Sequence, residues 1–373
     1  MSAASPEQRR RLRDLGITVG RLPTGRLNAI TDVAGVRVGH CTVWRDTPRL
    51  SRTGVTAIWP SDDPWGSEVF AGIYSFNGCG EFTGWIWLEE SGCLTSPIMT
   101  TGTHSVGAVR DALINIAEER GHPAHWHLGL VGETYDGFLS DAYANAVQKA
   151  EVEKALDAAT AGIVEEGCVG GGTGMNCHEF KGGIGTSSRL VDIAGERYTV
   201  GVLVQANYGV REELSIDGVP VGREIGVDIV PSGRRDAVNN AGSILIIVAT
   251  DAPLLPHQCK RLAQRATIGL GRIGGYGRNG SGDLFLAFST GNKMPSAGVD
   301  FLAKPAPKPP MPCRMLPNPE INPLFNATAE ATEEAIANAI CMAKTTHGRE
   351  GRVMHAMPLD RLQEMWRRHR PNG

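Results

Sequence analysis

A polar loop meets an apolar run at residues 239–249, which read NNAGSILIIVA. The run Ile244–Ala249 is rich in β-branched residues and bounded by turn-forming ones, which predicts a buried strand. Gly242 and Ser243 stand at its entrance. One interpretation of this junction is a plain loop that leads into a strand of the core.

A second interpretation is that the chain cuts itself at this junction. Cleavage between Gly242 and Ser243 would make the serine a new N-terminus. A terminal serine carries a nucleophile and a base in one residue, because its free α-amine can take the proton of its own hydroxyl. The pKa of an α-amine is about 7.7–8.0, against about 10.4 for lysine, so the amine is a usable base near neutral pH. These residues alone leave both interpretations open.

The rest of the chain alternates between strand and helix patterns, which is typical of a layered α/β protein. Strands are predicted at 36–40, 54–59, 127–131, 198–206 and 284–288, and helices at 105–119, 140–158, 329–345 and 359–369, with a further helix that begins at Pro256. Residues 208–242 are mostly polar and predict surface structure that ends in an exposed loop from 231 to 242. A proline-rich linker is expected over 304–323.

Composition and charge exclude several classes of protein. Among 373 residues, 41% are hydrophobic and 21% charged, which is ordinary for a globular protein, and the net charge of −3 gives no field that would attract nucleic acid or a membrane. No run of about 18 apolar residues predicts a membrane span. The first residues, MSAASPEQRRRLRD, lack the apolar segment of a signal peptide, so we expect a cytoplasmic protein. The arginines in this stretch are expected to form a solvated tail.

Metal and cofactor motifs are missing from the sequence. None of the eight cysteines forms a C-x-x-C pair, so neither a zinc site nor a dense disulfide framework is expected. His178 and Glu179 begin an H-E-x-x-H pattern, but Gly182 stands where the second histidine would be. We therefore expect an activity that uses no metal and no cofactor.

A glycine-rich segment, GGGTG, spans residues 170–174. It fits neither the P-loop nor the dinucleotide fingerprint. A tight turn without a ligand is one interpretation, and a nest of backbone N–H groups for an anion is another. In a hydrolase the same groups could face a developing oxyanion. A non-catalytic protein that binds an anion or nucleotide at this loop is thus one alternative function.

Ser281 and Asp283 form a short polar motif just before the strand at 284–288. An aspartate two residues after a serine commonly caps a turn. In a functional interpretation, the carboxylate orients a serine hydroxyl or an amine.

Taken together, the chain resembles peptidase family S58, also called P1, the group of the L-aminopeptidase/D-esterase (DmpA type) and the β-peptidyl aminopeptidases. The resemblance covers nearly the whole chain. It rests on eight short motifs in one order: RDLGI at 13–17, NAITDV at 28–33, FNG at 76–78, GETYDG at 132–137, GGGTGM at 170–175, VQAN at 204–207, GS at 242–243 and NGSGD at 279–283.

This resemblance implies a four-layer αββα sandwich, similar to N-terminal-nucleophile hydrolases but with different connectivity. It implies one peptidase domain over 1–373 that cuts itself between Gly242 and Ser243. The products are an α chain, 1–242, and a β chain, 243–373. The αβ heterodimers are expected to assemble as a tetramer.

The resemblance also implies roles for individual residues. Ser243 matches the nucleophile, and Asn207 matches the asparagine of the oxyanion hole. The other matches are Tyr135 at the site, Glu133 as the acid that holds the free amine of the substrate, Gly171 and Gly172 in substrate binding, and Ser281 with Asp283 as the pair that positions the nucleophile and its amine. The β-peptide specialists carry glutamate at the position of Asp283, so this residue favours the L-aminopeptidase/D-esterase type.

The predicted function is therefore that of a self-processing serine aminopeptidase or amidase. It would release N-terminal residues from short peptides, amides or esters of L-, D- or β-amino acids. A second alternative is an acyltransferase of the ornithine acetyltransferase type, which has a similar fold and self-processing. Those enzymes use threonine at the cut, so Ser243 disfavours this alternative.

Overall fold

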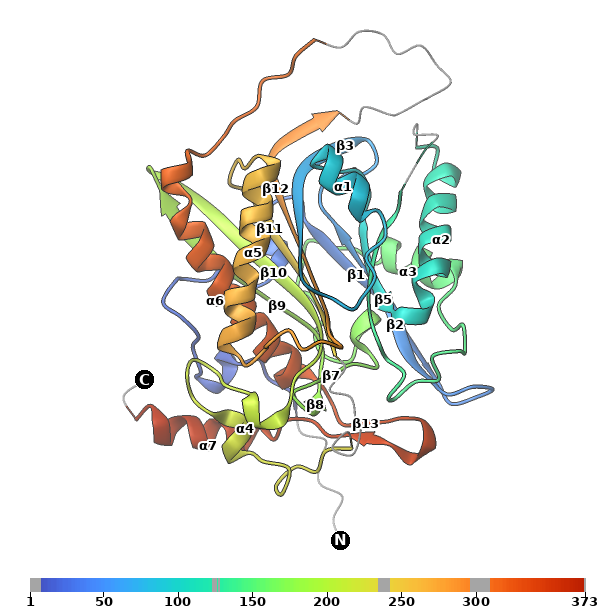
Figure 1. Ribbon diagram of the computed structural model, residues 1–373, viewed down its shortest axis with the longest axis vertical. Helices are drawn as coiled ribbons and strands as arrows, with labels where there is room; N and C mark the ends of the chain where they lie inside the picture. The colour runs from blue at the N-terminus through green and yellow to red at the C-terminus, as the bar shows by residue number, and fades with distance from the viewer. Residues whose placement is uncertain (1–7, 123–125, 127, 234–241, 296–308, 372–373) are drawn as a thin grey trace.

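Two β-sheets form the centre of the protein in the computed structural model, which describes residues 8–122, 126, 128–233, 242–295 and 309–371 (Figure 1). The first sheet has the order β1 (Arg37–Arg45), β2 (Ser51–Trp59), β5 (Ile98–Gly102), β6 (Leu130–Thr134). The second has the order β4 (Cys93–Leu94), β3 (Ser67–Gly78), β12 (Gly282–Pro295), β11 (Ser243–Thr250), β10 (Glu196–Asn207), β9 (Gly183–Ile193). Two short hairpins are added by β7 (Asn176–Cys177) with β8 (Phe180–Lys181), and by β13 (Thr346–His347) with β14 (Val353–Met354).

Helices cover the outer face of each sheet. On the four-stranded sheet lie α2 (Val106–Glu119) and α3 (Lys149–Asp157), and on the six-stranded sheet lie α5 (Pro256–Arg272) and α6 (Asn322–Met342) (Figure 1). The remaining helices are α1 (Trp85–Ser91), α4 (Val221–Glu224) and α7 (Leu359–His369). The order helix, sheet, sheet, helix is the predicted αββα sandwich.

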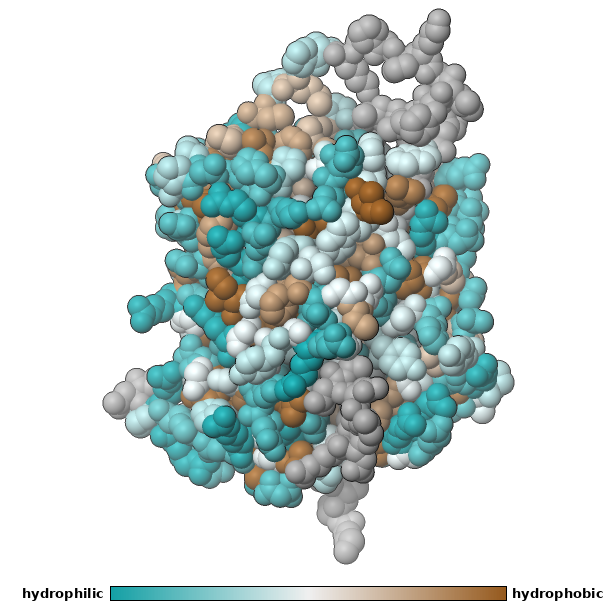
Figure 2. Space-filling view, in the orientation of Figure 1, coloured by the Kyte–Doolittle hydropathy of each residue, from teal (hydrophilic) through white to brown (hydrophobic). Residues whose placement is uncertain are grey.

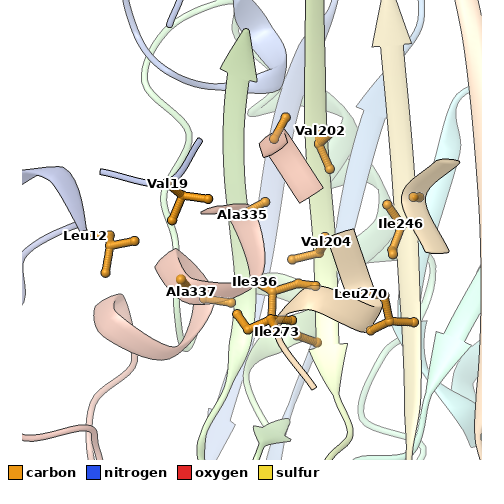
Figure 3. Close-up of a cluster of buried hydrophobic side chains, with 14 of the residues drawn as sticks. Leu12, Val19, Val202, Val204, Ile246, Leu270, Ile273, Ala335, Ile336 and Ala337 are labelled. Carbon is orange, nitrogen blue, oxygen red and sulfur yellow. The ribbon is translucent and has the colours of Figure 1, made fainter. Parts of the chain in front are cut away.

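Three apolar layers hold these four structural layers together. One lies between the sheets, one between the six-stranded sheet and its helices, and one between the four-stranded sheet and its helices. Strand β11 contributes to two of them, because Ile244, Ile246 and Val248 face the helices while Leu245, Ile247 and Ala249 face the other sheet. Figure 3 shows Ile246 in one apolar cluster with Val204 of β10, its register partner, and with residues of α6 such as Ile336. Burial on both faces explains why residues 244–249 are apolar without alternation.

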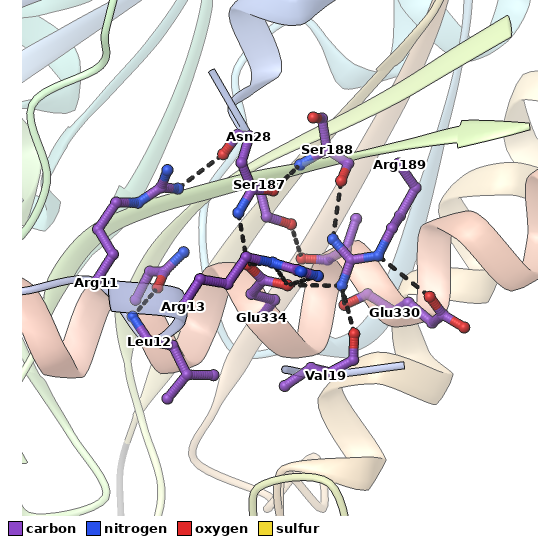
Figure 4. A network of polar contacts seen from close by, with 12 residues as sticks. Arg11, Leu12, Arg13, Val19, Asn28, Ser187, Ser188, Arg189, Glu330 and Glu334 are labelled. Carbon is purple, nitrogen blue, oxygen red and sulfur yellow. Dashed lines mark hydrogen bonds and ion pairs between the residues drawn. The ribbon is translucent and has the colours of Figure 1, made fainter. Parts of the chain in front are cut away.

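The arginine-rich start of the chain is anchored in the protein, so the prediction of a solvated tail is wrong. Arg13 forms an ion pair with Glu334 of α6 at 2.8 Å, and Arg189 of β9 reaches the same carboxylate at 2.7 Å (Figure 4). Arg11 pairs with Glu166 at 2.7 Å. Because Glu334 and Arg189 are fully buried, this network fixes the N-terminal segment against a helix more than 300 residues away in sequence.

The helix predicted over 140–158 is only half right. Residues 149–157 form α3, whereas the chain before it turns at Asn145, whose φ is 47°. Arg49 holds this irregular segment through Asp141 at 2.6 Å. A tertiary contact and a left-handed residue thus outweigh the helix propensity of the alanines.

The face drawn in Figure 2 is mostly hydrophilic, with apolar residues scattered over it in small groups. Of the helices in the described part of the chain, none combines the length and hydropathy that crossing a bilayer requires.

Candidate active site

Ser243 is the first residue of β11 and lies between two neighbouring strands. Its register partner on β10 is Asn207, the last residue of that antiparallel strand. Its partner on β12 is Gly282, the first residue of that parallel strand. Ser243 is only 4% exposed. Three strand ends therefore meet at one point, and each brings a residue that the sequence motifs had singled out.

The carbonyl oxygen of Gly242 is held by two donors in the uncut chain. The Ser243 hydroxyl donates to it at 2.5 Å, and the backbone N–H of Gly282 donates to it at 3.1 Å. Residue 242 also has no room for a side chain, because a Cβ there would lie 2.8 Å from Cα and Cβ of Tyr208. The loop predicted to precede it falls largely on residues 234–241, which lie outside the described residues.

Asn207 has a fixed amide orientation. The backbone N–H of Asn176 donates to its Oδ1 at 3.0 Å, and its Nδ2 donates to the carbonyl oxygen of Tyr135 at 2.9 Å. Because the Asn176 N–H can only donate and the Tyr135 carbonyl can only accept, the two ends of the amide cannot be exchanged. The bond to Tyr135 uses one of the two hydrogens on Nδ2.

Tyr135 comes to the site through its backbone rather than its ring. Its carbonyl holds Asn207, while the ring is 48% exposed and packs near His104, with ring centroids 5.9 Å apart. The hydroxyl lies over Gly137, since a Cβ at residue 137 would be 2.2 Å from it.

Ser281 and Asp283 form a buried pair on either side of Gly282, the register partner of Ser243. The Ser281 hydroxyl donates to Asp283 Oδ1 at 2.6 Å. Burial raises the pKa of Asp283 to about 6, and the hydrogen bonds from Ser281 and from the backbone N–H of Ile244 oppose this rise. Asp283 is thus attached to the residue that directly follows Ser243, so its charge acts on the strand end that carries the serine.

Glu133 lies on β6 of the opposite sheet and is 4% exposed. Its Oε1 accepts the backbone N–H of Glu81 at 3.0 Å, and its Oε2 accepts the Thr103 hydroxyl. Burial raises the pKa of Glu133, while these two hydrogen bonds lower it. Gly80 lies close to both the carboxylate and Gly282, the register partner of Ser243, because a Cβ built on it would lie 3.2 Å from Oε1 and 3.1 Å from Cα of Gly282.

The glycine-rich segment is a buried 3₁₀ turn, and the N–H groups of Gly170, Gly171 and Gly172 already donate to groups of the protein. The N–H of Gly171 donates to Thr56 Oγ1 at 3.1 Å, and that of Gly172 donates to the carbonyl of Val169 at 2.9 Å. The glycines are required by close packing, since a Cβ at Gly171 would lie 2.1 Å from Gln205 Oε1. Anion binding at this loop would require these bonds to break, so the geometry argues against a nucleotide-binding protein.

Sequence reasoning missed the residues that hold the functional groups in place. Thr103 and the backbone N–H groups of Glu81, Asn176 and Gly282 had no predicted role. The groups that these residues bind lie far from them in sequence, so no local motif could have revealed the contacts. Gly282 alone had a signal nearby, because it stands between Ser281 and Asp283, which were both predicted to belong to the site. Within the described parts of the chain, no group of three or more His, Cys, Asp or Glu side chains is placed to hold a metal ion.

Comparisons with known proteins agree on one family. The model of peptidase family S58 matches residues 28–354. A β-peptidyl aminopeptidase, BapA, from Sphingosinicella microcystinivorans is 42% identical over 386 residues, which cover 99% of this chain and 95% of the relative.

Solved structures with the same fold are also similar over almost their whole length. The β-aminopeptidase of a Burkholderia species is 48% identical with a TM-score of 0.87, over 96% of this chain and 99% of that one. The L-aminopeptidase D-Ala-esterase/amidase of Ochrobactrum anthropi, described as a new variant among the Ntn-hydrolase fold, is 39% identical with a TM-score of 0.86, over 96% and 98%. The chain therefore belongs to peptidase family S58 and is a hydrolase, an aminopeptidase of the N-terminal-nucleophile type.

Proposed function

We propose that this aminopeptidase makes its own nucleophile by cutting the bond between Gly242 and Ser243. The observation that carries the proposal is the position of Ser243 at the start of β11, with the preceding carbonyl oxygen already bonded to the N–H of Gly282. A carbonyl fixed in this way is polarised before any attack, and the N–H can stabilise the negative charge that develops on its oxygen.

The self-cleavage proceeds in two steps, an acyl shift and the hydrolysis of an ester. Ser243 Oγ attacks the carbonyl carbon of Gly242, the hydroxyl proton passes to the Ser243 nitrogen as the C–N bond breaks, and the acyl group moves from nitrogen to oxygen. The resulting ester is then hydrolysed by water, which gives a carboxylate on Gly242 and restores the serine hydroxyl. The cut frees the α-amine of Ser243, which the uncut chain does not have.

In the mature enzyme the same hydroxyl attacks a substrate amide or ester. The α-amine takes the hydroxyl proton and passes it to the leaving group, and water later releases the acyl group. The remaining hydrogen on Asn207 Nδ2 faces the developing oxyanion, while Tyr135 supports that asparagine through its carbonyl. Ser281 and Asp283 position the strand end and its amine through the N–H of Ile244.

The proposed substrates are short peptides, amides or esters with a free amine on the acyl residue. The buried carboxylate of Glu133 is the group that binds this amine. A buried charge is stable only when it is paired, so a cationic partner in the substrate would be favoured. The relatives named β-peptidyl aminopeptidase and β-aminopeptidase support β-aminoacyl compounds as substrates, with L- and D-aminoacyl compounds as the other members of a test panel.

The two fragments, 1–242 and 243–373, are proposed to stay together as one folded domain. Strands β11 and β12 of the second fragment lie between β3 and β10 of the first, so the backbone hydrogen bonds of the sheet join the fragments on both sides. A tetramer of αβ pairs and a cytoplasmic location complete the proposal. Size-exclusion chromatography with light scattering tests the assembly.

Mass spectrometry under denaturing conditions tests the self-cleavage. The wild type is expected to give two fragments, and the smaller should begin Ser-Ile-Leu. Ser243→Ala should stay in one piece and be inactive toward the p-nitroanilides of L-, D- and β-alanine. Full activity in an uncut wild-type chain would overturn the proposal.

A further inference from the structure

The carboxylate of Glu133 accepts hydrogen bonds from two other segments of the chain. The backbone N–H of Glu81 binds one oxygen, and the hydroxyl of Thr103 binds the other. Thr103 begins the 3₁₀ turn Thr103–Ser105 that directly follows β5, and β5 pairs with β6 so that Thr101 lies opposite Glu133. The parallel register of β5 and β6 therefore places the Thr103 side chain next to Glu133.

These two hydrogen bonds fix the orientation of the carboxylate. Each carboxylate oxygen has two lone-pair sites, and each oxygen gives one of them to a protein donor. The remaining sites are left for a further donor. A Cβ built on Gly80 would lie 3.2 Å from Oε1 and 3.1 Å from Cα of Gly282, the residue opposite Ser243, so the carboxylate lies close to the strand end that carries Ser243.

We propose that Thr103 is the positioning residue that makes the enzyme select substrates with a free amine, because it holds the Glu133 carboxylate in the orientation that accepts the ammonium group. The proposal rests on the proposed role of Glu133 as the amine-binding acid. Without the hydroxyl, Oε2 would lose its donor and the carboxylate could turn about its last bond. The amine would then be bound in several orientations instead of one.

Electrostatics around Glu133 support the same role. Burial raises the pKa of Glu133, and the hydrogen bond from Thr103 is the largest influence that lowers it. The charged groups that face this carboxylate are the acids Glu81 and Asp136, which disfavour its ionisation, and His104, which favours it. The Thr103 hydroxyl therefore helps to keep Glu133 in the anionic form that an ammonium group requires.

The test compares two substrates that differ only in the amine, β-alanyl-p-nitroanilide and propionyl-p-nitroanilide. The ratio of their kcat/KM values measures selection for the amine. A hydrogen bond to a charged group typically changes affinity by about 10- to 100-fold, so Thr103→Val should lower the ratio by that factor. Thr103→Ser keeps the hydroxyl. Because serine can donate a hydrogen bond of similar strength to Glu133, the ratio for this variant should stay within about threefold of the wild-type ratio.

Two further variants make the outcome specific. Thr101→Val is the matched control, because the Thr101 hydroxyl donates to the carbonyl of Gly54 rather than to Glu133, and it should leave the ratio unchanged. Glu133→Gln should abolish amine selection. If Glu133→Gln keeps the wild-type ratio, the amine-binding role of Glu133 fails, and the proposed function fails with it.

A different result overturns the Thr103 proposal alone. This is the case if Glu133→Gln loses selection while Thr103→Val and Thr103→Ala keep it, or if Thr103→Val slows both substrates equally. Each variant is first shown by mass spectrometry to give the two fragments and by circular dichroism to be folded. If Thr103→Val does not fold, Thr103→Ala and Thr103→Ser provide the comparison.

Discussion

Asn207 and Ser243 lie directly opposite each other in the antiparallel ladder of β10 and β11. Opposed residues in such a ladder send their side chains to the same face of the sheet. The asparagine amide is thus brought to the serine by strand pairing, and Asn176 and Tyr135 fix its orientation.

We expect Asn207→Ala to lower kcat by about 10²–10³, because loss of one oxyanion donor has a cost of this size. The KM should change much less, since the donor acts on charge that develops only in the transition state. Steady-state kinetics with β-alanyl-p-nitroanilide measure both constants. An unchanged kcat in fully cut enzyme would exclude Asn207 from the oxyanion hole.

Gly242→Ala should slow self-cleavage by about 10- to 100-fold, because displacing the scissile bond by about 1 Å has an effect of this order. The displacement arises because the added Cβ would meet Tyr208 at 2.8 Å. Gly271→Ala is the control, since no atom lies within 4 Å of its added Cβ. The rate is followed as the loss of the uncut mass after refolding. Equal rates in the wild type and Gly242→Ala would contradict the steric argument.

Below the pH range in which the α-amine of Ser243 becomes protonated, the activity should fall further as the pH drops through about 6, because protonation removes the charge of Asp283. The folded-state pKa is above the ordinary value of 3.8, so the folded protein binds this proton more tightly than the unfolded chain does. This group therefore favours the fold at low pH, and its contribution is lost as the pH rises through about 6. Inactivation near pH 5.5 should thus occur without unfolding.

Profiles of kcat/KM from pH 4.5 to 8, with circular dichroism at each pH, test this prediction. Asp283→Asn should be slow throughout and should lack the loss of activity near pH 6. Glu133→Gln should retain that loss of activity, which distinguishes the effect of the Asp283 carboxyl from that of the Glu133 carboxyl. A pH profile for Asp283→Asn that has the same shape as the wild-type profile would show that another group is responsible.

Glu334→Gln should destabilise the protein by about 3–5 kcal/mol, the usual effect of removing one partner from a buried ion pair. It would leave Arg189 buried and would weaken the contact with Arg13, which belongs to the other fragment after cleavage. Glu196→Gln is the control, because its pair with Arg314 is exposed and should not change the melting temperature measurably. Thermal unfolding of the cut enzyme measures both variants, and equal melting temperatures would contradict the inferred role of the network.

Local patterns were sufficient for much of the fold. The helices α2 and α7 and the strands β10 and β11 were predicted close to their observed bounds, and the start of α5 was predicted at Pro256. Their signals are short-range, because helical spacing of apolar residues and an unbroken apolar run depend only on neighbours in sequence. The prediction over 140–158 was wrong in its first half, where the contact between Arg49 and Asp141 and the turn at Asn145 decide the backbone.

The sequence by itself determined the family, the residues proposed for the site and the apolar run that becomes a central strand. Only the tertiary structure decided that Asn207, Ser243 and Gly282 share one register, that Thr103 and Glu81 hold Glu133, and that Arg13 near the start of the chain pairs with the buried Glu334 of α6. These contacts join segments up to more than 300 residues apart. Their geometry depends on how the two sheets pair and stack, and a local pattern of side chains carries no information about that.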